Sequence, residues 1–487
     1  MYDVLIIGGG VVGCALARQL SRYQGNIALL EAAEDVADGA SKANSGIVHA
    51  GFDAKPGTKK AYYNVKGAAM YATLAPALGV PYRRNGALVL GFEPEDRQTI
   101  QKLYDQGQKN GVKELQILER DEILRLEPQT NPAVTCALYA PTSAIVSPYE
   151  MTLALSYHAA QNGVEFIFDA PVSQLSHDGE AWHVATPKGE FVARAIVNCA
   201  GVGAAKLHNQ ISDTPVEIIP RKGEYYLLDH TVKPPFDHTM FQVPSKMGKG
   251  VLVTPTAHGN ALLGPSAIDV EDPDDKATTQ SGLDFVLDRC RLTWPAVSVR
   301  PVITTFAGIR AHSTGDDFII GEVSGAPQNA FEAIGIESPG LSAAPAIGEE
   351  LGEMVAEALK LPGKRLFQPA VPLRKPFFAM TDEERAEACR QDPDYGRVVC
   401  RCEVVTEAEI RDAIRRPVGA RSIDGVKRRT RAGMGRCQGG FCSPRVLEIL
   451  CEELGVSPLS ITKSGGESRL LVGTLEEIAK EARGDAK

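Results

Sequence analysis

The sequence lacks the long apolar runs that mark membrane proteins. After the first residues, no apolar run approaches the ~18 residues that a membrane span needs. The opening MYDVLIIGGGVVGCALARQL also lacks the basic stretch that precedes the apolar core of a signal peptide. We therefore expect no direct membrane span, so that any membrane contact would come through a partner.

Cysteine is scarce, with ten in 487 residues. A disulfide framework is not expected, and the shortage favours a reducing cytoplasm, with peripheral attachment at the inner face of the cell membrane as a second option. Six cysteines stand singly and are expected to be small buried residues: Cys14, Cys136, Cys199, Cys290, Cys389 and Cys451.

An excess of basic charge is also missing. The formal net charge is −9, which argues against nucleic acid as a partner. The length exceeds what one compact core holds, so two or three domains are expected.

The first thirty residues instead carry a dinucleotide-binding pattern. Residues 3–7 (DVLII) predict a buried parallel strand, and Gly8, Gly10 and Gly13 follow it in G-x-G-x-x-G spacing at the start of a helix. These glycines permit a tight turn, a close approach of a pyrophosphate and close helix–strand packing. Glu31 ends a second strand (27–30), where it can bind ribose hydroxyls and disfavours NADP.

Later segments indicate that the dinucleotide is FAD. The small-residue loop GASKANSGIVHAGFD (39–53) replaces the βαβ unit that usually follows at once in NAD enzymes. Three further markers are VNCAG (197–201), DDFIIGE (316–322) and ESPGLSAAPAIGEELGEMV (337–355). In the last, Ser338 and Pro339 precede a helix whose N-terminus would stabilise an anionic reduced flavin.

These segments together resemble the D-amino-acid-oxidase-like superfamily of FAD enzymes, over about residues 1–370. The resemblance implies a fold of α/β plus α+β class, in which a Rossmann-like FAD domain (1–80, 145–210, 305–365) is interleaved with an antiparallel-sheet substrate domain (81–144, 211–304). Strands are expected at 82–92, 216–228, 250–256 and 260–268. A capping box at Ser147–Glu150, with Pro148 in the first turn, predicts a helix through about Gln161. The expected FAD-binding residues are Gly8, Gly10, Val12, Gly13, Glu31, Ser41, Ser45, Gly46, Val172, Ala200, Gly201, Gly340 and Leu341.

Within this superfamily, two groups of enzymes share short sequence motifs with the chain. Glycerol-3-phosphate oxidases and dehydrogenases resemble it at HAGFD, PSKMGKGVLVTPT, GPSAID, FAGIRAHSTGDDFIIGE and IESPGLSAAPAIG. L-2-hydroxyglutarate dehydrogenases share NSGIVHAG, IVSPYE and RKGEYY. Both groups oxidise a secondary alcohol beside an anionic arm, so a small anionic hydroxy substrate is expected. Glycerol 3-phosphate ranks first; L-2-hydroxyglutarate and an opine remain alternatives.

Four residues are expected to act on the substrate. His49 is the candidate base because it lies in the loop 39–53 and, by resemblance, at the position of the family's active-site histidine. His312 is the alternative base. Arg310 is the candidate anion clamp, since guanidinium binds phosphate or carboxylate bidentately. Lys249 is a second candidate cation or an ordinary hairpin lysine, and Ser338 would contribute a hydroxyl or N–H. Arg221 and Lys222 would add positive field or form salt bridges.

The remaining four cysteines form a C-terminal pattern, Cys400-x-Cys402 and Cys437-x4-Cys442. Helices capped by Thr406 and opened by Pro444 would bring the thiolates together, and N–H groups there and at Gly439–Gly440 would bond to cluster sulfurs. The segment resembles the bacterioferritin-associated-ferredoxin-type [2Fe-2S] domain, as appended to anaerobic glycerol-3-phosphate dehydrogenases. A four-cysteine zinc site and coincidence are the alternatives. We expect a linker at 366–395, the cluster domain at 396–456 and a tail with a charged helix at 457–487.

A basic run precedes the second cysteine pair: Lys427, Arg428, Arg429, Arg431 and Arg436. It is either a solvated face or a set of cations that offsets the negative cluster and docks an acidic or redox partner. The sequence thus predicts an FAD dehydrogenase that passes electrons through a [2Fe-2S] cluster to an acceptor protein or companion subunit. A redox-sensing protein with a vestigial flavin domain is the alternative of another class.

Overall fold

The computed structural model describes residues 1–231, 233–244 and 250–475. It divides into two compact units, of which the first comprises residues 1–32 and 36–373 and the second residues 33–35 and 374–487. The helices of the first unit are α1 (Val11–Leu20), α2 (Lys59–Ala77), α3 (Asp96–Lys109), α4 (Arg120–Leu126), α5 (Pro148–Gln161), α6 (Ala204–His208), α7 (Gln280–Thr293) and α8 (Gly340–Ala358). No helix in the described ranges is long and apolar enough to cross a membrane.

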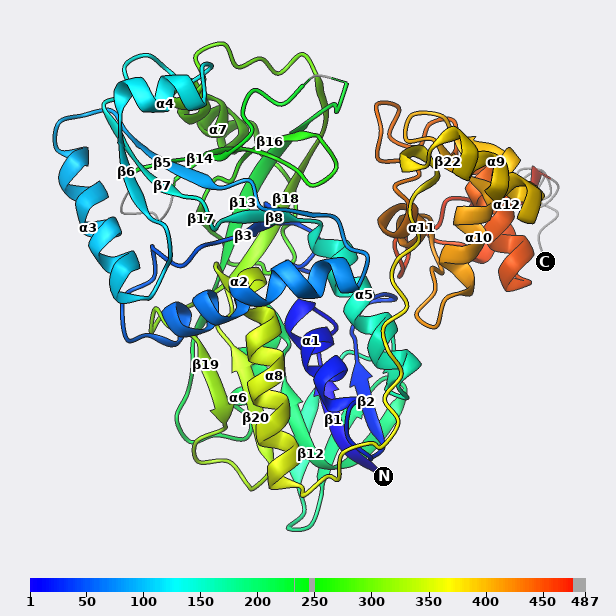
Figure 1. Cartoon of the computed structure of the whole chain (residues 1–487). Coiled ribbons are helices and arrows are strands. Elements are labelled where there is room, and N and C mark those ends of the chain that lie inside the picture. The colour runs from blue at the N-terminus through cyan, green and yellow to red at the C-terminus, as the bar shows by residue number, and fades with distance from the viewer. Residues whose placement is uncertain (232, 245–249, 476–487) are drawn as a thin grey trace, which may run out of the picture. The chain divides into compact units, whose positions relative to one another are not determined.

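The first sheet of this unit is built around parallel strands. Its order is β10-β11-β12-β1-β2-β9, with β20 beside β12 and β19 beside β20. The strands are β1 (Tyr2–Ile7), β2 (Ile27–Leu30), β9 (Glu165–Ile167), β10 (Gln174–His177), β11 (Trp182–Thr186), β12 (Gly189–Asn198), β19 (Ile319–Glu322) and β20 (Ala330–Ile334). Strand β1 pairs in parallel with β2 and β12. Helices α1, α5 and α8 lie side by side against this sheet (Figure 1), so the predicted Rossmann-like arrangement is confirmed.

The second sheet has the order β17-β13-β16-β15-β14-β5-β7-β6, with β18 beside β13. Its strands are β5 (Ala87–Gly91), β6 (Gln116–Glu119), β7 (Cys136–Ala140), β13 (Ile218–Leu228), β14 (Thr239–Gln242), β15 (Leu252–Pro255), β16 (Ala261–Gly264), β17 (Ile268–Asp269) and β18 (Val302–Ser313). The expected antiparallel pairing holds except between β14 and β5, which run parallel. A small sheet joins β3 (Ile47–Val48), β8 (Ala144–Val146) and β4 (Tyr82–Arg83).

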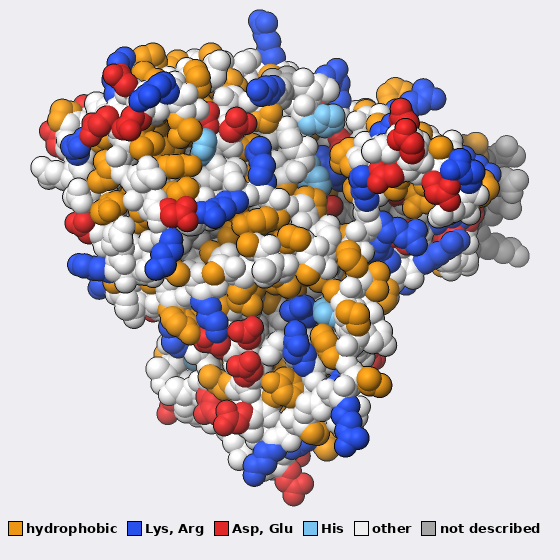
Figure 2. All heavy atoms as spheres, in the orientation of Figure 1, with side chains coloured by type: hydrophobic (Ala, Val, Ile, Leu, Met, Phe, Trp, Pro, Cys, Tyr) orange, Lys and Arg blue, Asp and Glu red, His pale blue; other side chains and the backbone are white. Residues whose placement is uncertain are grey.

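Cores lie on both faces of the second sheet. One packs Leu88 and Leu263 with Val286 of α7, and another packs Val89 and Leu138 with Ile100 of α3. Because alternate strand residues point to opposite faces, strands such as β5 and β7 supply both cores. Acidic and basic side chains are interspersed over the visible face of the first unit (Figure 2).

The helix predicted from Ser147 to Gln161 is present as α5, but its capping box is wrong. The Ser147 side chain makes no cap hydrogen bond. The Glu150 carboxylate instead contacts Nε2 of His258 at 2.9 Å, with both side chains about nine-tenths buried. Pro148 in the first turn therefore starts this helix without the reciprocal side-chain bonds.

The second unit is a small helical domain with a two-stranded sheet. Its elements are α9 (Asp382–Gln391), β21 (Val398–Cys400), β22 (Val405–Thr406), α10 (Glu407–Arg415), α11 (Ile423–Thr430) and α12 (Ser443–Leu454). Thr406 and Glu409 form a complete capping box at α10, which confirms the helix start predicted there. Ile410, Val426 and Ile449, from α10, α11 and α12, meet in its core.

Two of the six single cysteines differ from expectation. Cys14, Cys136, Cys199 and Cys290 are buried, whereas Cys389 and Cys451 are only half-buried because they lie on partly solvated faces of α9 and α12. The predicted charged helix at the end of the chain falls on residues 476–487, outside the described residues.

Candidate functional site

The close packing of β1 and α1 needs glycine at two positions, one in the turn between them and one in the first turn of α1. Gly8 has a φ of +108°, and a Cβ there would lie 2.4 Å from the carbonyl oxygen of Cys199. A Cβ on Gly13 would lie 2.0 Å from the carbonyl oxygen of Gly8. These contacts explain why strand and helix approach so closely here.

The N-terminus of α1 presents backbone N–H groups to a cavity. Its N-cap residue is Gly10, which has no side chain to cap the helix, and its first turn contains no acid. The N–H of Val11 donates to Oγ of Ser41 at 2.8 Å, and the N–H of Gly9 donates to Oε2 of Glu31 at 2.5 Å. An open helix N-terminus with a carboxylate at the end of the next strand fits the pyrophosphate and ribose of a dinucleotide.

That cavity lies in the first unit and has a volume of about 1480 Å³. It exceeds the ~300–1,000 Å³ of an ordinary ligand pocket, so it has room for a dinucleotide and a small substrate. Of the predicted FAD-binding residues, it is lined by Gly8, Gly10, Val12, Glu31, Ser41, Ser45, Val172, Ala200, Gly201, Gly340 and Leu341.

Two predicted FAD-binding residues, Gly13 and Gly46, do not line the cavity. Both serve the backbone instead. Gly13 packs against Gly8, and Gly46 has a φ of +66° with the carbonyl oxygen of Val146 only 2.5 Å from a Cβ placed there. Their effect on a ligand would therefore act through the shape of the loops that surround it.

Arg310 lies on β18 and lines the cavity. One of its nitrogens donates to the carbonyl oxygen of Ser266 at 2.9 Å. Across the described part of the chain, no carboxylate lies within ion-pair distance of this guanidinium. A half-buried guanidinium without a counter-ion is suited to bind an anionic ligand.

The neighbouring cations are already neutralised. Arg221, directly opposite Arg310 on β13, donates to Asp269 at 2.6 and 3.1 Å, and Lys222 donates to Asp275 at 2.7 Å. The salt-bridge interpretation of these two residues is therefore correct. Lys249 lies outside the described residues.

His49 and Ser338 reach the same cavity from other elements. His49 follows β3, where its N–H donates to Oγ of Ser342 in α8 at 2.8 Å and its ring lies 5.8 Å from that of Phe241. Ser338 precedes α8, whose N-cap, Pro339, provides no side-chain cap. The cavity thus joins residues from both sheets and from the start of α8.

Several cavity residues were not predicted from the sequence, and two of them, Lys60 and Glu337, form an ion pair. Lys60 of α2 and Glu337 before α8 both line the cavity, and Nζ of Lys60 donates to Oε1 of Glu337 at 2.7 Å. The same carboxylate oxygen lies 3.0 Å from Nδ1 of His312. Glu337 adjoins the predicted Ser338, but nothing local in the sequence indicates its two partners.

In the second unit, the four clustered cysteines meet as two close pairs. Sγ of Cys402 lies 3.7 Å from Sγ of Cys437. The thiol of Cys442 donates to Cys400, and this bond, with backbone N–H groups, lowers the pKa of Cys400 to about 6. Burial raises the pKa of Cys437, but hydrogen bonds from Phe441 and Gly439 outweigh it, so that its pKa lies below the usual value. Thiolates surrounded by N–H donors fit an iron–sulfur cluster.

Three of the five basic residues before Cys437 form ion pairs within this unit. Arg428 and Arg429 donate to the buried carboxylate of Asp35 at 2.6 to 2.8 Å, and Arg431 donates to Glu403 at 2.8 Å. All three arginines are buried or nearly so. These three therefore form neither a solvated face nor a docking site, since a buried ion pair is neither exposed nor available to a partner.

Two family models match the chain. The model "FAD dependent oxidoreductase" matches residues 3–354, and "BFD-like [2Fe-2S] binding domain" matches residues 398–452. The chain belongs to the FAD-dependent oxidoreductase family. Its cofactors are FAD in the first unit and a [2Fe-2S] cluster in the second, so the alternative of a zinc site is not favoured.

Similar proteins align with different shares of this FAD-dependent oxidoreductase. "Glycerol 3-phosphate dehydrogenase" of Caloramator mitchellensis is 46% identical over 97% of this chain and 98% of its own. The solved L-alpha-glycerophosphate oxidase of Mycoplasma pneumoniae, with FAD bound, is 30% identical, has a TM-score of 0.72 and covers 77% of this chain and 99% of its own. The mitochondrial L-2-hydroxyglutarate dehydrogenase of Caenorhabditis elegans is 30% identical over 55% of this chain and 64% of its own.

Replacing Gly13 with alanine should weaken FAD binding by this oxidoreductase. The new Cβ must displace the Gly8 carbonyl, and such overpacking costs about 1–3 kcal/mol of stability. The measurement is the flavin-to-protein ratio of the purified enzyme together with its thermal unfolding. Gly363→Ala is the control, because a Cβ there meets nothing within 4 Å. Equal flavin contents in both variants would contradict this account of the turn.

Proposed function

We propose that this enzyme oxidises sn-glycerol 3-phosphate to dihydroxyacetone phosphate and passes the electrons through its [2Fe-2S] cluster to an external acceptor. The observation that carries the proposal is the 46% identity to a glycerol 3-phosphate dehydrogenase over 97% of the chain, which includes both units. The match to an L-2-hydroxyglutarate dehydrogenase spans only 55% of the chain. An oxidase would have no use for a built-in one-electron carrier, so a dehydrogenase is favoured.

The residues of the cavity suit this reaction. Bound FAD supplies the hydride acceptor. Arg310 holds the phosphate, since its guanidinium has no carboxylate partner among the described residues and can form parallel charge-assisted bonds. Fixing the anionic arm in this way fixes the orientation of the alcohol carbon.

The alcohol proton requires an acceptor, and His49 is proposed for it. Its backbone is held by the hydroxyl of Ser342, so the loop that carries it is fixed to the start of α8. A neutral imidazole can accept a proton near neutral pH. Ser338 would contribute a hydrogen bond beside it, and Lys249 would add a second cation for a dianionic phosphate.

The exposure of the cysteine loops supports an external acceptor protein. Cys402 and Cys437 are half-buried, and Phe441, between Cys437 and Cys442, is 89% exposed. We propose that Cys400, Cys402, Cys437 and Cys442 ligate the cluster and that its open edge meets the acceptor. A cytoplasmic location, with peripheral membrane contact through that acceptor, remains part of this proposal.

An anaerobic reduction screen tests the substrate. Glycerol 3-phosphate should bleach the flavin of the purified holoenzyme, whereas L-2-hydroxyglutarate and opines should leave it oxidised over the same time. Iron and acid-labile sulfide are measured on the same sample. Bleaching by L-2-hydroxyglutarate alone would overturn the substrate, an amine product would indicate an opine, and no bleaching by any hydroxy compound would favour a redox sensor.

A further inference from the structure

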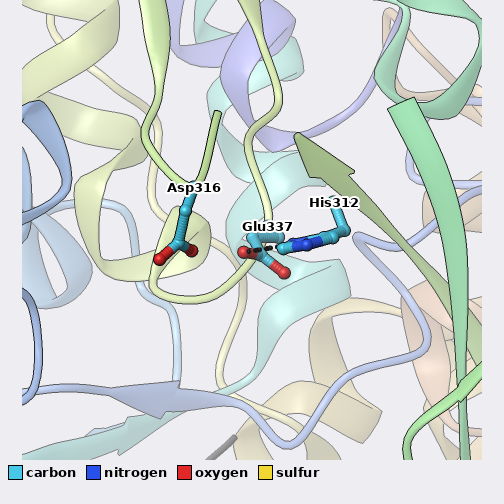
Figure 3. A group of neighbouring side chains, drawn as sticks. All are labelled: His312, Asp316 and Glu337. Carbon is cyan, nitrogen blue, oxygen red and sulfur yellow. Dashed lines mark hydrogen bonds and ion pairs between the residues drawn. The ribbon is translucent and has the colours of Figure 1, made fainter. Parts of the chain in front are cut away.

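Three elements far apart in the sequence bring a charged cluster to the cavity wall. Lys60 lies in the first turn of α2, His312 lies near the end of β18, and Glu337 lies between β20 and α8. Oε1 of Glu337 accepts from Lys60 at 2.7 Å and contacts Nδ1 of His312 at 3.0 Å. Figure 3 shows Glu337 between the imidazole of His312 and the carboxylate of Asp316.

This cluster has the spacing of a metal site, since ligand atoms of His312, Asp316 and Glu337 lie within 4.8 Å of one another. However, Nζ of Lys60 donates to Glu337 and lies 3.3 Å from Oδ1 of Asp316. The lysine ammonium therefore already provides the positive charge that the carboxylates require. A divalent ion would face that ammonium at close range, so the cluster is not a metal site.

The cluster holds Glu337 as a carboxylate. Burial raises the pKa of this carboxyl, but the Lys60 ammonium and hydrogen bonds from Lys60 and His312 outweigh it, so that its pKa lies below the usual value. A carboxylate can only accept hydrogen bonds, so Nδ1 of His312 must carry a proton. In the neutral ring, Nε2 is then the acceptor, as in other carboxylate–histidine pairs.

His312 lies where its Nε2 can contact a molecule bound in the cavity. The ring lines the cavity two residues after Arg310, so both side chains point from the same face of β18. Among the described residues, none hydrogen-bonds to Nε2. Two other charged groups near this region, Arg221 and Asp269, are bonded to each other.

We propose that Nε2 of His312 accepts a hydrogen bond from a substrate hydroxyl. Glu337 is the positioning residue that fixes the tautomer and orientation of the His312 ring. This inference rests on the proposed function, because it places the hydroxyl contact beside the arginine that holds the phosphate. His312 is then a specificity-determining residue rather than a spare base. Lys60 acts on the substrate only through Glu337.

The test compares Glu337→Gln with wild-type holoenzyme in anaerobic flavin reduction by glycerol 3-phosphate. Glutamine can present an N–H to Nδ1, so the acceptor at Nε2 is no longer enforced, and kcat/KM should fall about tenfold or more. Glu337→Asp, which keeps the carboxylate, should recover part of the loss. The matched control is Glu150→Gln, which breaks the Glu150–His258 pair of similar burial outside the cavity and should leave kcat/KM unchanged. Flavin content and thermal unfolding confirm that each variant is folded.

A second substrate identifies the hydroxyl. Propane-1,2-diol 1-phosphate lacks the terminal hydroxyl of glycerol 3-phosphate but keeps the reacting one. If His312 contacts the terminal hydroxyl, Glu337→Gln and wild type should oxidise this analogue equally; if it contacts the reacting hydroxyl, the loss persists. The first result supports the inference; the second would make His312 the proton acceptor for the reacting hydroxyl and overturns its role as a specificity-determining residue. If glycerol 3-phosphate bleaches the wild-type flavin and kcat/KM of Glu337→Gln stays within twofold of the wild-type value, the inference is overturned and the proposed function stands. A wild-type flavin that glycerol 3-phosphate does not bleach overturns the proposed substrate, and the inference with it.

Discussion

Cys437→Ala is expected to abolish electron transfer to a one-electron acceptor while leaving the flavin reducible by substrate. Cys437 lies 3.7 Å from Cys402 and is stabilised as a thiolate by backbone N–H groups, so its loss opens the proposed ligand set. Removing the one-electron carrier should lower turnover with an acceptor protein by on the order of a hundredfold. Iron, sulfide and acceptor reduction are measured alongside anaerobic flavin bleaching.

Cys451→Ala is the matched control for this change. Cys451 is also a half-buried thiol of the second unit, but it lies on α12 and outside the two cysteine pairs. It should retain iron, sulfide and turnover. The ligand assignment is wrong if Cys437→Ala keeps its full iron and sulfide content, and the electron path is wrong if turnover survives loss of the cluster.

Arg310→Met is expected to cost most of the affinity for the anionic arm. Truncating one partner of a buried charge pair costs about 2–4 kcal/mol, which corresponds to a loss of about 30- to 1000-fold in kcat/KM. Arg310→Lys keeps the charge but not the parallel bonds, so its loss should be intermediate. Steady-state kinetics with glycerol 3-phosphate measure both variants.

Arg97→Met serves as the control for Arg310. Arg97 lies on the exposed face of α3, where it pairs with Glu119, so its replacement should leave kcat/KM within about twofold because exposed pairs contribute little. If Arg310→Met changed kcat/KM no more than Arg97→Met, another group would hold the phosphate. Lys249 would then be the first to replace.

The features that sequence reasoning predicted are those set by local rules. The β1–α1 turn follows from glycine spacing, and the start of α10 follows from the N-cap residue Thr406. Most of the FAD-binding residues predicted from the sequence line the cavity, because the flavin loop and the start of α8 contain recognisable runs of small residues. Local sequence patterns therefore pointed to this cavity.

The features it did not predict depend on partners far away in the chain. Glu150 forms no capping box because His258, 108 residues later, takes its carboxylate. Arg429 forms an ion pair with Asp35, 394 residues earlier in the chain. Glu337 and Lys60, 277 residues apart, meet only when α2 and the start of α8 come together. No local pattern indicates such pairs, since tertiary packing chooses them.

The most direct test of the central claim follows both cofactors in one anaerobic sample. Glycerol 3-phosphate is added to the purified holoenzyme while visible absorption reports the flavin and electron paramagnetic resonance reports the reduced cluster. The account predicts that the flavin bleaches and that the cluster signal then appears in wild type but not in Cys437→Ala. Flavin bleaching with a cluster that stays oxidised, while an acceptor protein is reduced at the same rate in both proteins, would contradict it.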